Sequence, residues 1–304
     1  MLFLLSLFIV GGCGGFSGNQ EEIESSASST SSESSSTTTD NTTESGTFVT
    51  VGHSGTVLTS SDGTTWNSRT SGTSNNLWGV TYGDSTFVAV GLSGTILTSS
   101  DGTTWTSRTS GTSNNLYAVT YGDSTFVAVG ASGKVITSSD GVTWSTWQSA
   151  PPMTGGGIYG ITYGEGTFIA VGESGVIITS PDGTTWQGRT SGTSNDLFGV
   201  TFGNSTFVIV GDTGTILTSS DATTCSNSGG TCSWTTRTSG TTKLFYGSIY
   251  GNSTFVAVGY TGTILTSSDG TTWTSRTSET TNILIGVTYG NSTFIKVGQD
   301  ALLT

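Results

Sequence analysis

The feature that most constrains the fold of this chain is a repeat of about 39 residues that runs from residue 46 to residue 304. Each unit contains a Val-Gly pair followed by a turn, and the glycines of these pairs are Gly52, Gly91, Gly130, Gly172, Gly211, Gly259 and Gly298. A complete unit divides into four strand-sized pieces that Gly, Asp and Ser turns separate. A period near 40 residues with four short strands is typical of a β-propeller, in which each repeat forms one blade. The sequence therefore predicts an all-β propeller of four-stranded antiparallel blades.

The number of blades depends on how the two ends of the repeat region combine. In one complete unit the expected strands, named A to D, are residues 77–82, 86–90, 95–99 and 104–108. The first unit lacks a piece for strand A, and the last unit lacks one for strand D. We expect about seven blades with an incomplete last blade. The alternative is six blades, with residues 284–289 completing the first one.

The first ten residues, MLFLLSLFIV, form an apolar run that is too short to span a bilayer but has the length of a signal-peptide core. The run leads into Val10-Gly11-Gly12-Cys13, which resembles the lipobox of bacterial lipoproteins, although no Lys or Arg precedes it. The resemblance implies that residues 1–13 are a signal peptide with its lipobox and that Cys13 carries a lipid anchor. The expected location is the bacterial cell envelope, periplasmic or surface-exposed.

Residues 14–45 are rich in Ser, Thr and Glu and contain almost nothing apolar, so we expect a disordered tether between the anchor and the propeller of residues 46–304. The chain has a formal net charge of −12, and six of its 20 acidic residues lie in the tether. The repeat region then has 14 acidic residues against 8 basic ones, a balance that repels a phosphate backbone. Nucleic acid is therefore not an expected partner, and the membrane is reached through the lipid anchor alone.

The most strongly repeated motif is Ser-x-Asp-Gly-x-Thr-Trp, which six units share, one of them with an insertion. It supplies the pairs Asp62 and Trp66, Asp101 and Trp105, Asp140 and Trp144, Asp182 and Trp186, Asp221 and Trp234, and Asp269 and Trp273. The motif resembles the Asp-box, or BNR repeat, of the propellers of sialidases, sortilin-type receptors and the photosystem II assembly factor family. We expect the carboxylate to accept backbone N–H groups across its own turn and the Trp to pack between blades. Six copies in one slot predict a structural motif, since they cannot all form one active site.

The residues that would carry sialidase chemistry are not arranged for it in the repeat pattern. The resemblance implies a convergent arginine cluster, whereas the arginines here share the outer-strand slot at Arg69, Arg108, Arg189, Arg237 and Arg276. We expect these side chains to spread around the rim in salt bridges or over seams between blades. His53 is the only histidine, so neither a His-rich metal site nor a Ser-His-Asp triad is expected. Glu173 and Asp212 are the best carboxylate pair, and solvated turn residues are the simpler interpretation. No catalytic residue, metal or cofactor is assigned.

One face of the propeller combines variable turns with aromatic side chains. The residue after the Val-Gly pair varies among the units and includes His53, Glu173, Asp212 and Tyr260. The start of strand A is expected on the same face, and five units offer a ring there: Trp78, Tyr117, Tyr159, Phe198 and Tyr246. This face is the candidate binding face for a glycan or a peptide. The simpler alternative is that the aromatic rings fill space between the blades.

Two cysteines, Cys225 and Cys232, lie in the loop inserted into one copy of the motif, and an exported domain favours a disulfide between them. The whole pattern predicts an envelope-anchored, non-catalytic binding or assembly-scaffold propeller with a glycan or protein partner. The alternative is a sialidase-like glycoside hydrolase or another glycan-active enzyme.

Overall fold

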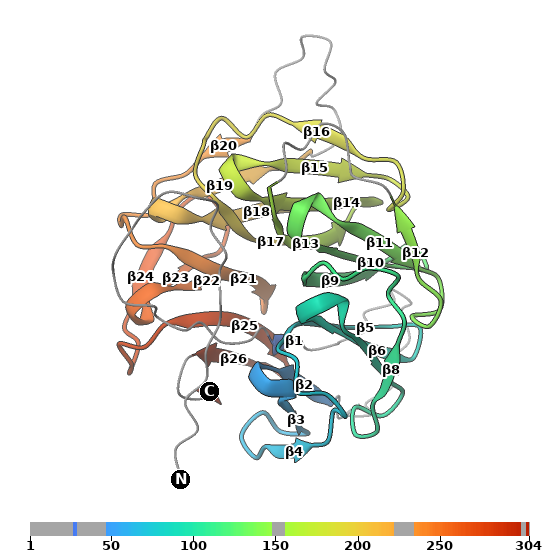
Figure 1. Ribbon diagram of the computed structural model, residues 1–304. Helices are drawn as coiled ribbons and strands as arrows, with labels where there is room; N and C mark the ends of the chain where they lie inside the picture. Colours follow the sequence, from blue (N-terminus) through green and yellow to red (C-terminus); the bar gives the residue numbers. More distant parts are fainter. Residues whose placement is uncertain (1–26, 29–46, 148–155, 222–233, 299–301, 304) are drawn as a thin grey trace, which may run out of the picture.

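The computed structural model describes residues 27–28, 47–147, 156–221, 234–298 and 302–303 of the chain. These residues form seven antiparallel sheets placed radially around a common axis, so the predicted β-propeller is confirmed (Figure 1). Six sheets have four strands and one has three, and the described residues contain no α-helix. We number the sheets as blades 1 to 7 in chain order.

In the four-stranded blades the strands are adjacent in chain order, with strand A nearest the axis and strand D at the outer edge (Figure 1). The A strands are β1 (Ala27–Ser28), β5 (Leu77–Gly83), β9 (Leu116–Gly122), β13 (Ile158–Gly164), β17 (Leu197–Gly203), β21 (Phe245–Gly251) and β25 (Leu284–Gly290). The B strands are β2 (Phe48–Val51), β6 (Thr86–Gly91), β10 (Thr125–Gly130), β14 (Thr167–Gly172), β18 (Thr206–Gly211), β22 (Thr254–Gly259) and β26 (Thr293–Gly298). The C strands are β3 (Val57–Ser60), β7 (Ile96–Ser99), β11 (Val135–Ser138), β15 (Ile177–Ser180), β19 (Ile216–Ser219), β23 (Ile264–Ser267) and β27 (Leu302–Leu303). The D strands are β4 (Asn67–Arg69), β8 (Thr106–Arg108), β12 (Ser145–Trp147), β16 (Gln187–Arg189), β20 (Thr235–Thr236) and β24 (Thr274–Arg276).

In blades 1 to 6 the connection between strands B and C is a single turn of 3-10 helix. These turns are η1 (His53–Gly55), η2 (Leu92–Gly94), η3 (Ala131–Gly133), η4 (Glu173–Gly175), η5 (Asp212–Gly214) and η6 (Tyr260–Gly262). The middle residue of each turn has a positive φ, as Ser54 does at 51°, and a glycine follows it. At η1 only glycine fits after Ser54, because a Cβ on Gly55 would lie 2.0 Å from the carbonyl oxygen of Thr73.

The ring closes with seven blades, and blade 7 has three described strands. The six-bladed alternative is wrong, because β25 pairs with β26 in a blade of its own. The expectation that blade 1 lacks strand A is also wrong: Ala27 pairs with Thr50 in the strand A position, and β1 contacts both β5 and β25. The other residues of the predicted tether lie outside the described residues, so its boundary at residue 46 stays a prediction.

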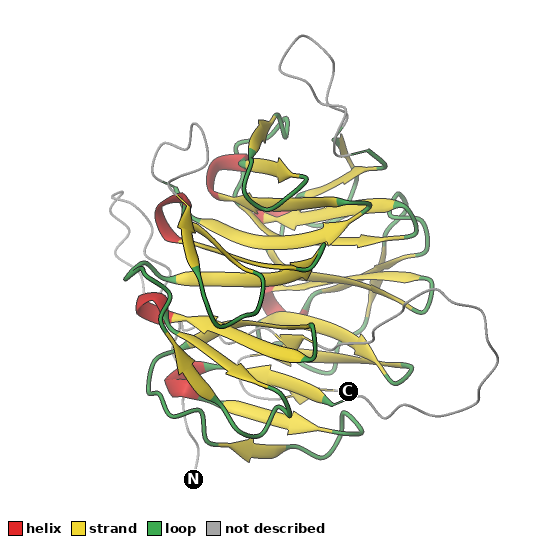
Figure 2. Cartoon of the chain, turned by 90° about the vertical axis from the view of Figure 1, so that its right-hand side faces the viewer, coloured by secondary structure: helices red, strands yellow, loops and turns green. Residues whose placement is uncertain are grey.

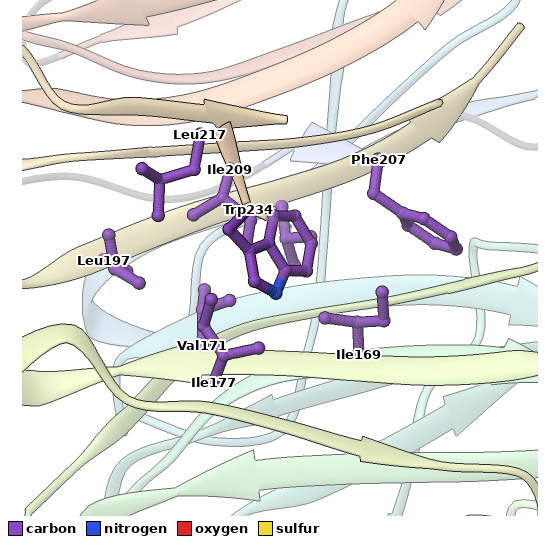
Figure 3. Packing of buried hydrophobic residues seen from close by; sticks show 9 residues of the cluster. Ile169, Val171, Ile177, Leu197, Phe207, Ile209, Leu217 and Trp234 are labelled. Atoms are coloured by element: carbon purple, nitrogen blue, oxygen red, sulfur yellow. The ribbon is translucent and has the colours of Figure 1, made fainter. Parts of the chain in front are cut away.

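The hydrophobic core is divided into clusters that lie between neighbouring blades. One cluster combines Ile169, Val171 and Ile177 of blade 4 with side chains of blade 5 that surround Trp234 (Figure 3). Alternate residues of each B strand face opposite neighbours, since Val208 belongs to a different cluster from Phe207 and Ile209. A single sheet therefore buries both faces only when a blade stands on each side of it, which is what holds the ring together. No helix among the described residues is long and apolar enough to cross a membrane.

Candidate functional site

The repeated Ser-x-Asp-Gly segment forms a turn between strands C and D, which we call the Asp-turn. In blade 1 the Oδ1 atom of Asp62 accepts the backbone N–H groups of Thr64 at 2.8 Å and Thr65 at 2.7 Å. The hydroxyl of Ser60 donates to the same carboxylate at 2.9 Å. The same bonds recur at Asp101, Asp140, Asp182 and Asp269. Because these carboxylates are occupied by their own turns, they are arranged for folding and not for binding a substrate.

The tryptophan of the motif lies immediately before strand D, whereas we expected it within that strand; in blade 2 the strand begins at Thr106 and not at Thr104. In five blades its indole Nε1 donates to the glycine carbonyl of the Asp-turn, at 2.8 to 3.1 Å. Trp105 of blade 2 packs in one cluster with Val49, Val51 and Val57 of blade 1, so the ring fills the seam between the two blades. In blade 5, where residues 222–233 lie outside the described residues, no described residue accepts the Nε1 proton of the buried Trp234.

The five arginines do not converge. Each donates from Nε to a threonine hydroxyl on strand C of its own blade, for example from Arg108 to Thr98 at 2.8 Å. Strand D is the outer strand of its blade (Figure 1). Four of the arginines end a strand D and Arg237 directly follows one, so all five are spread around the rim of the propeller, as predicted. Threonine hydroxyls, not the expected carboxylates, accept from the Nε atoms of these arginines. Burial lowers the pKa of Arg189, and the charge of Asp221 acts on it in the opposite direction. A carboxylate-binding arginine cluster of the sialidase kind is not formed by these residues.

The B–C turns and the segments that enter strand A share one end of the blades, which we call the turn face. The backbone N–H of Ser54 in η1 donates to Oδ1 of Asn76, which precedes β5 of the next blade, at 3.0 Å. Ser93 with Asn115 and Ser174 with Asp196 repeat this bond at 3.0 and 2.7 Å. The short helices accordingly lie towards one side of the side view (Figure 2). The Asp-turns join strands C and D, so the antiparallel pairing places them at the opposite ends of the blades.

Five aromatic side chains lie in sequence along the turn face, and we call Trp78, Tyr117, Tyr159, Phe198 and Tyr246 the aromatic row. The ring centroids of successive members are 5.4, 5.7, 5.2 and 5.7 Å apart, so each ring contacts the next across a blade seam. Tyr159 and Phe198 are stacked at 17°, and the other pairs are tilted by 53 to 54°. Trp78 is 9% exposed, and the other four are half-buried. The row therefore packs between blades and also presents ring surface to solvent.

The backbone of strand A explains why the aromatic side chains of the row lie along the turn face. The pairing of strand A with strand B skips one residue, as between Leu77 and Gly79, so Trp78 is the extra residue of a β-bulge. The skipped residues in blades 3 to 6 are Tyr117, Tyr159, Phe198 and Tyr246. A bulge re-aims a side chain at the edge of a ladder. The following glycine lets the blades approach: a Cβ on Gly160 would lie 2.4 Å from the carbonyl oxygen of Phe198.

Glu173 and Asp212, the expected carboxylate pair, both begin a B–C turn and are half-buried there. The Oε2 atom of Glu173 accepts the backbone N–H of Gly157 at 3.1 Å, beside the aromatic row. Oδ1 of Asp212 accepts the backbone N–H of Thr213 at 2.7 Å. In blades 1, 2 and 4 the equivalent N–H donates instead to an Asn or Asp side chain of the next blade. Leu244 stands in that position of the next blade and has no acceptor side chain. One oxygen of each carboxylate therefore accepts a backbone N–H, and the pair shows no arrangement for acid–base chemistry.

His53 and Tyr260 occupy the same turn position in blades 1 and 6. His53 is half-buried, and its Nδ1 lies 2.8 Å from the hydroxyl of Ser54, whereas Tyr260 is 38% exposed on the turn face. No group of three or more metal-ligating side chains occurs among the described residues. Cys13, Cys225 and Cys232 lie outside the described residues, so the lipid anchor and the disulfide stay predictions.

Sequence reasoning missed one acidic residue of this face. Asp196 precedes β17 in the position that Asn76 and Asn115 hold in blades 2 and 3. The sequence does indicate this residue, because Asp196 is a charged residue at a repeat position that is neutral in blades 2 and 3. The sequence prediction rested on the variable turn after the Val-Gly pair, whereas this residue lies in the segment before strand A.

No protein-family model matches the chain, and no curated protein matches it. Solved structures do. YCF48 from Cyanidioschyzon merolae is 17% identical with a TM-score of 0.70, covering 92% of this chain and 94% of that one. A structure of YCF48 bound to D1 peptide is 17% identical with a TM-score of 0.68, covering 92% and 90%. A catalytically inactive variant of virginiamycin B lyase from Staphylococcus aureus, with quinupristin, is 11% identical with a TM-score of 0.74, covering 92% and 94%. At these identities the likeness shows the propeller fold, which carries both binding proteins and enzymes.

Proposed function

We propose that this chain is a non-catalytic binding propeller that takes an extended segment of a partner protein on its aromatic row. The observation that carries the proposal is the continuous contact of five rings from Trp78 to Tyr246 across five consecutive blades. Surfaces that combine partly exposed aromatic rings with nearby polar groups are the usual composition of recognition sites. The described Asp-turns and arginines are engaged in their own blades, which supports a binding role over catalysis.

The length of the row favours a peptide over a compact ligand. Four successive ring contacts of 5.2 to 5.7 Å form an arc that a segment of about six extended residues spans, at roughly 3.3–3.6 Å per residue. The structure of YCF48 bound to D1 peptide supports the idea that this fold can bind a peptide, although its identity of 17% transfers no contact. The resemblance of the repeated motif to the Asp-box is compatible with this role, because Asp-box propellers include receptors and assembly factors. A glycan is the alternative ligand, because sugars also bind on aromatic rings.

The proposal includes display on the cell envelope, with Cys13 lipidated and the chain between Cys13 and β1 (Ala27–Ser28) as the tether. It rests on the apolar run and the lipobox-like sequence that ends at Cys13. The variant Cys13→Ser is expected to move the protein from the membrane fraction to the soluble fraction. An unchanged membrane fraction would refute the anchor and leave the binding proposal standing.

Site-specific photo-crosslinking in intact cells tests the binding proposal. A photo-crosslinking phenylalanine analogue replaces Tyr260 on the turn face, where the side chain is 38% exposed. The matched control carries the analogue at position 142 on the opposite face, where Val142 is 42% exposed. We expect a defined protein adduct from position 260, none from position 142, and loss of the adduct when Tyr159→Ala is added.

Equal adducts from both positions, or an adduct that survives Tyr159→Ala, would contradict the proposed face. A glycan array and a fluorogenic sialoside assay on the purified full-length protein test the alternatives. Glycan binding that Tyr159→Ala abolishes would replace the protein partner with a sugar. Turnover of the sialoside would overturn the non-catalytic assignment.

A further inference from the structure

The aromatic row is not uniform in charge along its length. At the seam between blades 4 and 5, where the rings of Tyr159 and Phe198 are stacked, the turn face carries two acidic residues. Glu173 begins η4 in blade 4, and Asp196 immediately precedes β17 in blade 5. The corresponding positions of blades 2 and 3 are neutral, with Leu92 and Ala131 for the first residue and Asn76 and Asn115 for the second.

The contacts of Gly157 place the carboxylate of Glu173 beside the rings. Its backbone N–H donates to Oε2 of Glu173 at 3.1 Å. A Cβ on the same glycine would lie 2.8 Å from Cε1 of Tyr159 and 3.5 Å from Cε2 of Tyr117. A Cβ on Gly156 would lie 3.0 Å from Oε2 of Glu173. One short stretch of backbone therefore separates this carboxylate from two members of the aromatic row.

The second carboxylate is fixed from the other side of the seam. Oδ1 of Asp196 accepts the backbone N–H of Ser174 at 2.7 Å, which ties the start of β17 to η4. Burial raises the pKa of the Tyr159 phenol, and the charges of Glu173 and Asp196 raise it further, so both carboxylates act on this ring. Within the described residues neither Glu173 nor Asp196 forms an ion pair. The sector thus has negative charge and aromatic surface but no internal cation.

We propose that the sector of Tyr159, Phe198, Glu173 and Asp196 binds a lysine or arginine side chain of the partner segment. The rings contact the aliphatic stem and the π-face interacts with the cation, while the carboxylates accept its charged hydrogen bonds. The inference rests on the proposed function and adds the chemistry of the partner. It assigns the cation-binding subsite to the seam between blades 4 and 5, where both positions are acidic, whereas blades 2 and 3 carry neutral residues in both positions.

Peptide display against the immobilised full-length protein tests this inference. Randomised nine-residue peptides are selected on the wild type and on the double variant Glu173→Gln with Asp196→Asn. Both substitutions keep an oxygen that can accept the turn N–H groups, and asparagine is the residue that blades 2 and 3 already use. The control is Asp84→Asn on the opposite face, which removes one acidic charge and installs the residue that blades 5, 6 and 7 carry there.

We expect Lys or Arg to be enriched in peptides selected on the wild type and on the control. We expect selected peptides to bind the double variant about tenfold more weakly, and an arginine-to-citrulline change to weaken binding to the wild type similarly. Selected peptides without basic enrichment, whose binding Tyr159→Ala abolishes, would overturn the cation subsite and leave the proposed function intact. Selection of no peptide at all, or binding that Tyr159→Ala leaves unchanged, would overturn both.

Discussion

The side-chain amide of Asn291 in blade 7 donates to the backbone carbonyl of Ser61 in blade 1, at 3.0 Å and across 230 positions of the chain. The glycine of the same Asp-turn also touches blade 7, because a Cβ on Gly63 would lie 2.8 Å from Cδ1 of Ile295. In blades 2, 3, 4 and 6 this glycine faces the preceding blade in chain order, as Gly102 of blade 2 faces Val49 of blade 1. The contact between blades 7 and 1 therefore repeats the ordinary blade seam and closes the ring.

Removing the bond between Asn291 and Ser61 should lower the free energy of unfolding by more than removing an asparagine from the equivalent turn of another blade. Asn291 and Asn252 occupy equivalent turns with φ of 46° and 44°, so replacement by alanine costs similar backbone strain in both. We expect Asn291→Ala to lower the free energy of unfolding by about 0.5–1 kcal/mol more than Asn252→Ala, since it also removes the hydrogen bond to Ser61. The value is at the low end for a hydrogen bond because this bond is exposed to solvent. Urea denaturation of the two variants measures the difference. Equal losses would show that the bond contributes nothing to closure.

The indole hydrogen bond of the Asp-turn can be isolated by comparing two tryptophans. Trp186 is 3% exposed and donates to the carbonyl of Gly183 at 2.8 Å, whereas no described residue accepts from the buried Trp234. Replacement by phenylalanine removes a similar apolar volume at both sites. We therefore expect Trp186→Phe to destabilise by roughly 1 kcal/mol more than Trp234→Phe, since it leaves a carbonyl unpaired. Thermal and urea unfolding of both variants test this, and a larger loss at Trp234 would contradict it.

Acid should destabilise the propeller through its Asp-turns. The backbone N–H groups of Thr143 and Val142 and the hydroxyl of Ser138 lower the pKa of Asp140 from 3.8 to about 2. The pKa values of Asp62, Asp101, Asp182 and Asp269 are also lowered. A carboxylate with a folded pKa below its unfolded value contributes stability above about pH 4, and this contribution is lost as the pH falls towards the folded pKa. Stability should therefore decrease between about pH 4 and pH 2.

The variant Asp140→Asn tests the acid effect at a single turn. Asparagine still offers an oxygen to the two N–H groups but carries no charge, so it should be less stable than the wild type at neutral pH. The difference in unfolding free energy between the two proteins should shrink as the pH falls from 4 to 2, because the wild type then loses its charge as well. Urea midpoints at several pH values measure it. A difference that stays constant over this range would contradict the assignment.

The sequence predicted most of the fold because the repeat carries its turn chemistry and strand pattern in nearly identical copies. It did not predict the strand that completes blade 1, because Ala27 and Ser28 lie in a Ser/Thr-rich segment with no alternation of apolar residues. It predicted that Trp78 lies on the turn face but not that this residue is a bulge. A bulge follows from the register of two strands, which a single strand's sequence does not specify.

The candidate site was predicted in part for a similar reason. The aromatic row follows from one repeated position, so its members could be found by aligning the units. The pairing of Arg108 with Thr98 also recurs in four other blades, and that spacing was available in the sequence. We expected carboxylate partners because arginine is charged, whereas the antiparallel pairing of strands C and D places a threonine hydroxyl within reach. The sector around Tyr159 depends on contacts between blades, which the alignment of repeats does not give.

The seam between blades 6 and 7 should open first. Its cluster of Val256, Val258, Ile264, Leu284 and Val287 contains no tryptophan among the described residues, whereas each of the other five clusters packs against one. Burial of a large side chain contributes roughly 2–3 kcal/mol, so this seam lacks a major part of the stabilisation that the others have.

Hydrogen exchange offers a matched test of this seam, because β6, β10 and β22 have the identical sequence Thr-Phe-Val-Ala-Val-Gly. Their intrinsic exchange rates are nearly equal, so a difference in protection reports the surroundings of each strand. Peptide fragments that extend into the following turn are distinguished by Leu92, Ala131 or Tyr260. Val256 of β22 is 5% exposed, whereas the equivalent Val88 of β6 and Val127 of β10 are fully buried. This difference in exposure agrees with weaker packing around β22. We expect the amides of β22 to exchange at least about tenfold faster than those of β6 and β10. Equal protection in the three strands would show that blade 7 is held as firmly as the complete blades, by contacts other than a tryptophan in the seam.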